Sequence, residues 1–170
     1  HGIDEKDFFP IREGDELYPK LLEFKEKTVP VDAEFIVYFN SRNIHRKRPG
    51  DTLMAYKHFC DQIGEEKAKK TALVMHTQPS DNNGTDLQAM KNTFYPEGNI
   101  YFSSQKISPQ QMNFMYNMAD LTVLLSSNEG WGLSLTEAMM TGTMIIANAT
   151  GGMQDQMRFS KDGKWIDFTP

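Results

Sequence analysis

The chain has 170 residues, of which 39% are hydrophobic, so it can bury the core of one domain but hardly of a second. Its net charge of -5 argues against a general nucleic-acid-binding protein, because a phosphate backbone demands clustered lysine and arginine. The single cysteine, Cys60, excludes an intramolecular disulfide and a multi-cysteine metal site.

Apolar runs of strand length alternate along the chain with stretches of helical periodicity. A short helix is predicted at residues 15–27, after a segment of little periodicity. From there on, strands are predicted at 35–39, 71–75, 100–102, 121–125, 144–147 and 165–168, and helices at 51–63, 86–94, 108–118, 132–140 and directly after Gly151 and Gly152.

Two of the predicted helices carry clear end signals. Ser108 precedes Pro109 at the first helical position, and Gln111 can complete a capping box with Ser108. Gly142 is placed to end the helix at 132–140. These signals indicate where the first of the two helices begins and where the second ends.

Strands that alternate with helices predict an α/β fold with a parallel sheet covered on both faces. Right-handed crossovers then give a doubly wound, Rossmann-like single domain, which we place at residues 31–170, after a linker at residues 1–30. Ligands of such sheets bind beyond the carboxyl ends of the strands, so the loops that follow the strands share one rim.

The segment after the fourth strand reads Ser-Ser-Asn-Glu-Gly-Trp-Gly-Leu-Ser-Leu-Thr-Glu over residues 126–137. Gly130 and Gly132 let the backbone approach a ligand closely, and the helix that follows begins with unpaired amides. Those amides form an anion site, for which a diphosphate is a natural guest. Trp131, between the two glycines, either stacks on a ligand or covers the helix start.

Glu129 and Glu137 flank this anion site. Carboxylates accept hydrogen bonds from sugar hydroxyls, so one carboxylate on each side suggests a ligand with a sugar at both ends of its phosphates. A nucleotide sugar has that shape. The alternative is that both are solvated charges at a helix end, although the apolar neighbours of Glu137 would then require a hydrogen-bonding partner for its carboxylate.

A basic cluster at residues 42–48 follows the first strand and therefore lies on the same rim. Arg42 offers a fork for two phosphate oxygens and Lys47 a point charge, so the pair suits a diphosphate. The alternative is a solvated basic loop.

The chain resembles the retaining glycosyltransferases with two Rossmann-like domains, the group 1 glycosyl transferases. Residues 129–137 match that family's signature of two glutamates separated by seven residues, and Gly151-Gly152 matches its glycine pair. Arg42 and Lys47 match an arginine and a lysine five residues apart after the first strand of the donor-binding domain. The likeness spans nearly the whole chain.

The resemblance implies a role for each matching residue. Arg42 and Lys47 would hold the donor diphosphate, and Glu129 would contact the donor sugar; these three form the expected catalytic set. The expected donor-binding set is Gly130, Trp131, Gly132, Leu133, Glu137 at the ribose and Ile107 at the base. The resemblance implies no metal and no cofactor, since protein groups neutralise the diphosphate of the nucleotide-sugar substrate.

The resemblance also implies that the chain is the C-terminal half of a larger enzyme. The chain begins with His1, and we expect a missing N-terminal domain that binds an unidentified acceptor and can associate peripherally with a membrane. We expect a cytoplasmic protein, because no secretory signal and no apolar run of roughly 20 residues is present. Without the other half of the cleft, we expect the isolated piece to be inactive.

Other functional classes remain open or are disfavoured at this point. A nucleotide-sugar epimerase of the same architecture and a non-catalytic nucleotide-sugar-binding relative would carry the same residues. A P-loop nucleotidase and a dinucleotide dehydrogenase are disfavoured, because their glycine-rich signatures are missing. A glycosidase is disfavoured too, since nothing places the two carboxyl groups across one bond.

Overall fold

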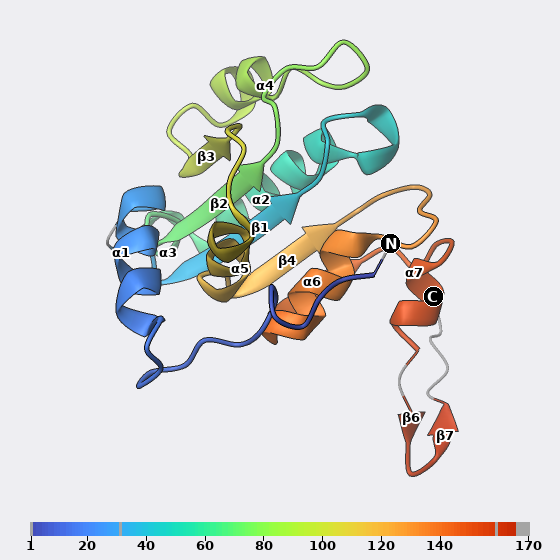
Figure 1. Ribbon diagram of the computed structural model, residues 1–170. Helices are drawn as coiled ribbons and strands as arrows, with labels where there is room; N and C mark the ends of the chain where they lie inside the picture. The colour runs from blue at the N-terminus through green and yellow to red at the C-terminus, as the bar shows by residue number, and fades with distance from the viewer. Residues whose placement is uncertain (1, 31, 159, 166–170) are drawn as a thin grey trace.

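The computed structural model describes residues 2–30, 32–158 and 160–165. A five-stranded sheet in the order β3-β2-β1-β4-β5 lies between two layers of helices (Figure 1). The elements are α1 (Tyr18–Thr28), β1 (Phe35–Asn40), η1 (His45–Lys47, a 3₁₀ turn), α2 (Pro49–Ile63), α3 (Glu65–Ala68), β2 (Thr71–His76), α4 (Leu87–Phe94), β3 (Ile100–Ser103), α5 (Pro109–Asn117), β4 (Leu121–Leu124), α6 (Leu133–Thr141), β5 (Met144–Ala147), α7 (Met153–Gln156), β6 (Ser160–Lys161) and β7 (Lys164–Trp165). The predicted doubly wound α/β fold is confirmed.

All neighbouring strands of this sheet run parallel. The longest pairing joins β1 to β2, from Phe35 opposite Thr71 to Asn40 opposite His76. Since every strand points the same way, the loops that follow the five strands meet at one edge. The common rim predicted from the sequence is therefore present.

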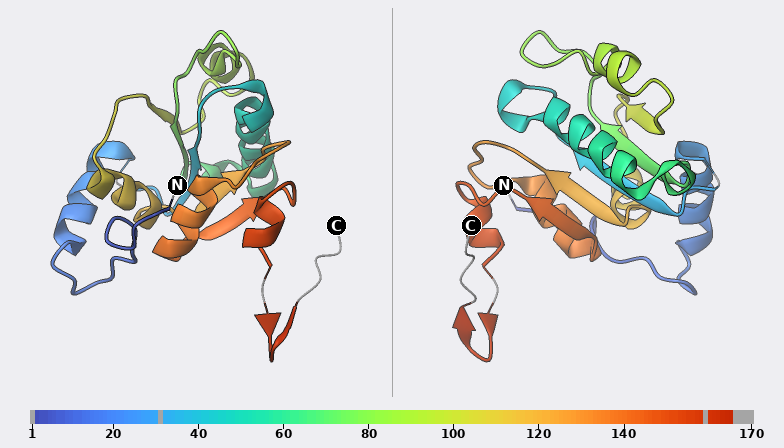
Figure 2. Two further views of the ribbon diagram at one scale, coloured as in Figure 1. Left: turned by 45° about the vertical axis from the view of Figure 1, so that its right-hand side comes forward. Right: turned by 180° about the vertical axis from the view of Figure 1, so that it is seen from behind.

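The central strand β1 is buried on both faces. Ile36 and Tyr38 belong to a core that contains residues of α1, α5 and α6. Val37 and Phe39 belong to a second core with residues of α2 and α4 on the opposite face. Figure 2 shows helices on both sides of the sheet. Because alternate side chains of a strand point to opposite faces, a strand between two helical layers requires a continuous apolar run.

The segment before β1 packs on the first of these cores. Ile11 and Leu21 are buried there, and the Phe9 amide donates to Asn113 Oδ1 of α5 at 3.2 Å. The Ile11 amide donates in the same way to Asn117 Oδ1 at 2.7 Å. The domain boundary at residue 31 stays a prediction, but the residues from Phe9 onward are attached to the domain.

Local signals account for most helix ends. Ser108 and Gln111 form the predicted capping box at the start of α5, and Gly142 ends α6 in the left-handed conformation with φ +78°. The helix expected from residue 15 begins at Tyr18 instead. Pro19 explains the later start, because a proline is tolerated only in the first turn of a helix.

The C-terminal strand differs from the expectation. Trp165 lies in β7, which pairs antiparallel with β6, and this hairpin extends away from the five-stranded sheet (Figure 1). It is not the sixth strand of the parallel sheet. The rest of the strand predicted at 165–168 lies outside the described residues.

Candidate functional site

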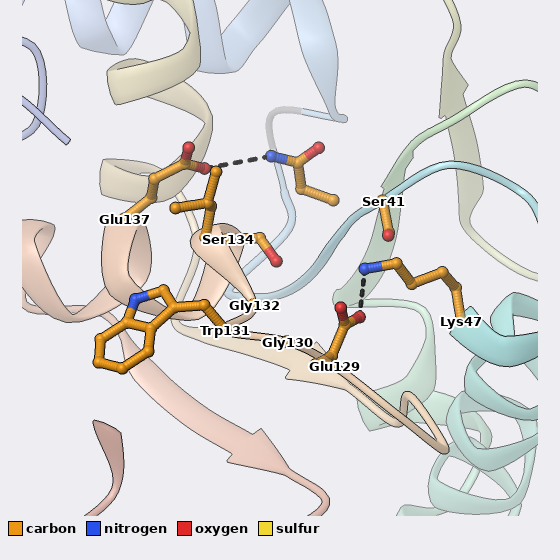
Figure 3. Close-up of a pocket in the computed structure, with 10 residues that line it drawn as sticks. Ser41, Lys47, Glu129, Gly130, Trp131, Gly132, Ser134 and Glu137 are labelled. Carbon is orange, nitrogen blue, oxygen red and sulfur yellow. Dashed lines mark hydrogen bonds and ion pairs between the residues drawn. The ribbon is translucent and has the colours of Figure 1, made fainter. Parts of the chain in front are cut away.

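A cavity of about 650 Å³ opens on the rim, where the loop after β1 meets the start of α6 (Figure 3). It is lined by Asn40, Ser41, Lys47, Glu129, Gly130, Trp131, Gly132, Leu133, Ser134 and Glu137. The structure thus brings together seven of the nine site residues predicted from the sequence. The other two, Arg42 and Ile107, do not line this cavity.

The floor of the cavity is the turn that starts α6. Its N-cap residue is Gly132, with φ +86°, and no side chain caps the helix. A Cβ at this position would lie 3.1 Å from the side chain of Met153, so both the backbone conformation and the packing favour glycine. The first amides of the helix are therefore left for a ligand, and an anion is the ligand they favour.

The glycine pair at 151–152 lies against this turn. A Cβ on Gly151 would come within 2.0 Å of the Glu129 carbonyl oxygen, and one on Gly152 within 2.0 Å of the Gly130 carbonyl oxygen. The Gly152 amide donates to the Glu129 carbonyl at 3.1 Å. The two glycines thus let the loop after β5 hold the turn that carries Glu129.

Glu129 is buried, with 5% of its side chain exposed, and it is held by two cations. Its Oε1 accepts from Lys47 Nζ and its Oε2 from Arg46 Nη1, the latter at 3.0 Å. Burial acts to raise the pKa of Glu129, but hydrogen bonds from Lys47 and Arg46 outweigh it and leave the pKa below its ordinary value. The carboxylate is therefore ionised and neutralised by its partners.

Arg46 was not among the residues predicted from the sequence. The short turn η1 places it beside Lys47, and its Nη1 also donates to the Asn128 carbonyl at 2.9 Å. In return, the Ser127 amide donates to the Arg46 carbonyl at 2.8 Å. The basic run at 42–48 signalled cations at this loop, but only the three-dimensional path of the turn shows which of them reach Glu129.

Arg42 points elsewhere. Its Nε lies 3.1 Å from Asp81 Oδ2, and 66% of its side chain is exposed. The loop that carries Asp81 is fixed by the buried Asn43, whose side-chain amide donates to the Thr85 carbonyl at 2.7 Å. Contact between Arg42 and a ligand in the cavity would require its side chain to leave Asp81.

Glu137 lies at the other end of the cavity, away from the cations around Glu129 (Figure 3). Its Oε2 accepts from the Tyr116 hydroxyl at 2.5 Å and from Asn40 Nδ2 at 3.5 Å. Burial raises the pKa of Glu137 above its ordinary value, and the Tyr116 hydrogen bond only partly opposes that. The hydrogen-bonding partner that the apolar surroundings of Glu137 required is Tyr116, which the sequence did not single out.

Trp131 covers the outer side of the α6 start. Its indole is 47% exposed and, in Figure 3, lies on the side away from Glu129. Its Nε1 donates to Thr136 Oγ1 at 3.0 Å, and Gln156 donates to its carbonyl oxygen. The indole thus lies against the start of α6 and is partly exposed, and its role toward a ligand stays a prediction.

Ile107 lies in a separate cavity of about 360 Å³. That cavity is also lined by Phe24 and Lys27 of α1 and by Gln111 of α5. The side chain of Ile107 packs against the first core. Its predicted role at the base depends on its backbone and stays a prediction.

In the described part of the chain, no three or more histidine, cysteine, aspartate or glutamate residues lie close enough to hold a metal ion. Nor does any helix in the same residues have the length and apolarity needed to cross a membrane.

Comparison with known proteins gives a family match over most of the chain. The sequence profile of the family described as "Glycosyl transferases group 1" matches residues 22–169. A D-inositol 3-phosphate glycosyltransferase of Corynebacterium urealyticum is 36% identical over 59 residues, which are 35% of this chain and 14% of that protein. A protein of the same name from Thermomonospora curvata is 40% identical over 52 residues, or 31% of this chain and 12% of the relative.

Solved structures share the fold. The C-terminal domain of a glycosyl transferase group 1 family protein (LpcC) from Francisella tularensis superposes with a TM-score of 0.64 at 18% identity, over 89% of this chain and 72% of that one. Anabaena Alr3699/HepE, solved in complex with UDP-glucose, gives a TM-score of 0.69 at 14% identity, over 93% of this chain and 40% of that one. The sequence matches to the two curated glycosyltransferases, in contrast, cover only about one seventh of the length of those proteins.

Proposed function

The chain belongs to the group 1 glycosyl transferases, and we propose that it is the donor-binding domain of an enzyme that transfers a sugar from a nucleotide diphosphate sugar to an acceptor. We further propose that the transfer retains the configuration of the anomeric carbon. The relatives named as glycosyltransferases support the reaction class, and the Anabaena structure with UDP-glucose supports a nucleotide-sugar donor.

One observation carries the proposal: the order of groups along the cavity. Lys47 and Glu129 lie at one end, the uncapped start of α6 forms the middle, and Glu137 lies at the other end. This order matches the sugar, diphosphate and ribose of an extended nucleotide sugar. Each part of the ligand would meet the group whose chemistry suits it.

In this arrangement the diphosphate binds the amides from Gly130 to Leu133 and the ammonium of Lys47. Glu129 orients the hydroxyls of the donor sugar, and Glu137 accepts hydrogen bonds from the ribose. Arg42 joins the diphosphate after leaving Asp81, Trp131 borders the site, and the backbone of Ile107 contacts the base.

The chemistry would rest on positioning and on electrostatic stabilisation. As the bond from the anomeric carbon to the phosphate oxygen breaks, its electron pair passes to the diphosphate. The acceptor forms the new bond to the anomeric carbon on the same face of the sugar, and its proton passes to the departing diphosphate. Lys47 and the helix amides lower the free energy of that charge, while the Glu129 carboxylate faces the electron-poor sugar. We propose that these protein groups serve without a metal or a cofactor.

The acceptor would bind to a second, N-terminal domain that closes over the cavity, because the curated relatives and the Anabaena protein are much longer than this chain. We place the whole enzyme in the cytoplasm, in peripheral contact with a membrane through that other domain, and do not expect it to bind nucleic acid. The epimerase and the non-catalytic relative are not favoured, since the curated relatives are named as glycosyltransferases.

Calorimetry on the 170-residue chain tests the donor site, with UDP, ADP, UDP-glucose and ADP-glucose as ligands. We expect either the uridine or the adenosine ligands to bind. Lys47→Met should weaken that binding at least about tenfold, which corresponds to a loss of roughly 1.4 kcal/mol in binding free energy. Lys57→Met is the matched control, because Lys57 pairs with Asp61 on α2 and does not line the cavity. Equal loss in both variants, or no binding by any of the four ligands, would overturn the proposal.

A second assay separates binding from turnover. We expect the 170 residues to bind the donor but not to transfer its sugar, and the enzyme with both domains to transfer it with retention, as read from the anomeric proton by NMR. Sustained transfer by the chain alone, or an inverted product, would contradict these two parts of the proposal. Formation of an epimer from donor alone would favour the epimerase.

A further inference from the structure

The carboxylate of Glu137 is held by two polar side chains from other elements. Tyr116 comes from α5 and Asn40 from the end of β1, whereas Glu137 itself lies on α6. The Asn40 amide also donates to the Tyr116 hydroxyl oxygen at 2.8 Å, so the three groups form a closed triangle. A triangle built from three elements fixes the carboxylate more firmly than a single contact would.

Glu137 accepts two of the three hydrogen bonds of the triangle, and both fall on one oxygen of the carboxylate, Oε2. Among the described residues, none donates a hydrogen bond to the other oxygen, Oε1. Glu137 lines the cavity, so this second oxygen keeps its hydrogen-bonding capacity for a ligand.

The phenol of Tyr116 is tightly packed. The side chain is fully buried, and its ring meets Tyr38 edge-on with centroids 5.0 Å apart and an interplanar angle of 85°. On another side Phe8 packs against it at 5.9 Å and 72°. Buried polar side chains cost stability unless they are paired, so a hydroxyl fixed at this place serves the carboxylate that it contacts.

We infer that Tyr116 and Asn40 are positioning residues for ribose recognition: they hold Glu137 through Oε2, so that Oε1 accepts the hydrogen bonds of the ribose hydroxyls. This inference rests on the proposed donor site and adds two residues to it. Neither residue would take part in bond breaking. Their contribution would be selectivity for a ribonucleotide over its deoxy counterpart.

The decisive variant is Tyr116→Phe, which removes the hydroxyl and keeps the ring. With UDP and 2′-deoxy-UDP, or ADP and 2′-deoxy-ADP, as paired ligands, we expect the ribose preference of the wild-type chain to fall about three- to tenfold, the range of one hydrogen bond. Tyr38→Phe is the matched control, because Tyr38 is equally buried but, among the described residues, its hydroxyl hydrogen-bonds only to Met112 Sδ, at 3.4 Å, and not to Glu137. We expect that variant to keep the wild-type preference.

A second measurement needs no ligand. The titratable groups that face Glu137 are Tyr116 and Tyr38, and no cation of the described residues contacts it. Since the Tyr116 hydrogen bond lowers the pKa of Glu137, Tyr116→Phe should raise it further, as followed by carbon-detected NMR of the carboxyl group. Tyr38→Phe should not raise it.

The outcomes distinguish this inference from the proposed function. If Glu137→Gln weakens nucleotide binding while Tyr116→Phe leaves the ribose preference and the Glu137 pKa unchanged, the donor site stands and the positioning role is wrong. If no nucleotide binds, the proposed function fails and the role in ribose recognition fails with it. If Tyr116→Phe and Tyr38→Phe reduce the preference equally, the effect is general packing and the inference is overturned.

Discussion

The two glutamates of the cavity are the same residue type in opposite electrostatic settings. Glu129 is buried between Lys47 and Arg46, whereas Glu137 is held by the neutral groups of Tyr116 and Asn40. The pKa of Glu129 lies below its ordinary value and that of Glu137 above it. The surrounding side chains, and not the carboxyl group itself, decide what each end of the cavity can bind.

This difference has opposite consequences for stability. From the lowered pKa of Glu129, its contribution to stability is present above the ordinary value of 4.5 and is lost as the pH falls through the folded-state pKa. From the raised pKa of Glu137, its contribution is present below 4.5 and is lost as the pH rises through the folded-state pKa. Four substitutions test the contrast.

The largest loss of stability is expected from a substitution that disturbs the turn carrying Glu129 and leaves the surroundings of Glu137 intact. Gly151→Ala would place a Cβ within 2.0 Å of the Glu129 carbonyl oxygen, at a residue with φ +52°, and should lower the free energy of unfolding by about 3 kcal/mol in urea titration. Gly130→Ala is the control, with no atom within 4 Å of the added carbon and an expected change of at most about 0.5 kcal/mol. Equal midpoints for the two variants would refute the support role of Gly151.

Removing the charge of Glu129 is expected to have a smaller effect. Glu129→Gln leaves Lys47 and Arg46 without their carboxylate and should lower the stability at pH 7 by about 1–2 kcal/mol, because Arg46 is half exposed. The loss should shrink as the pH falls through the lowered pKa of Glu129. Urea titrations at several pH values measure it, and a loss independent of pH would contradict the ion-pair explanation.

The exchange of glutamate for glutamine at the other end of the cavity, at Glu137, should raise the stability and not lower it. Glu137→Gln keeps an acceptor for Tyr116 and removes a carboxylate whose ionised form burial disfavours. We expect no change in stability below pH 4.5 and a gain in stability at pH 7. A variant that is less stable than wild type at pH 7 would show that the neutral setting does not destabilise the charge.

The smallest change in stability is expected for Arg42, which does not line the cavity. Its pair with Asp81 is exposed, so Arg42→Ala should change the free energy of unfolding by at most about 0.5 kcal/mol. If Arg42 joins the diphosphate when the donor binds, the same variant weakens nucleotide binding although it leaves stability unchanged. Asp81→Asn frees Arg42 and should not weaken binding. A stability loss above 1 kcal/mol for Arg42→Ala would show that the pair is structural.

Much of this architecture follows from local sequence. The apolar run of β1, the capping box of Ser108 and Gln111 and the end of α6 at Gly142 were all predicted, and each is present. The helix start after Gly132 was predicted within one residue. These features depend on residues close together in the chain, so composition and spacing are enough to recognise them.

The partners of the two glutamates were not predictable in that way. Arg46 instead of Arg42 reaches Glu129, and Tyr116 and Asn40 reach Glu137 across gaps of 21 and 97 residues. Such pairs depend on how helices cross the sheet and on which rotamers the packing allows. The sequence by itself determined a parallel sheet with two carboxylates flanking a helix start. Tertiary structure alone decided which of them is paired with cations and which is held by neutral side chains, because burial and partner geometry exist only once distant elements pack together.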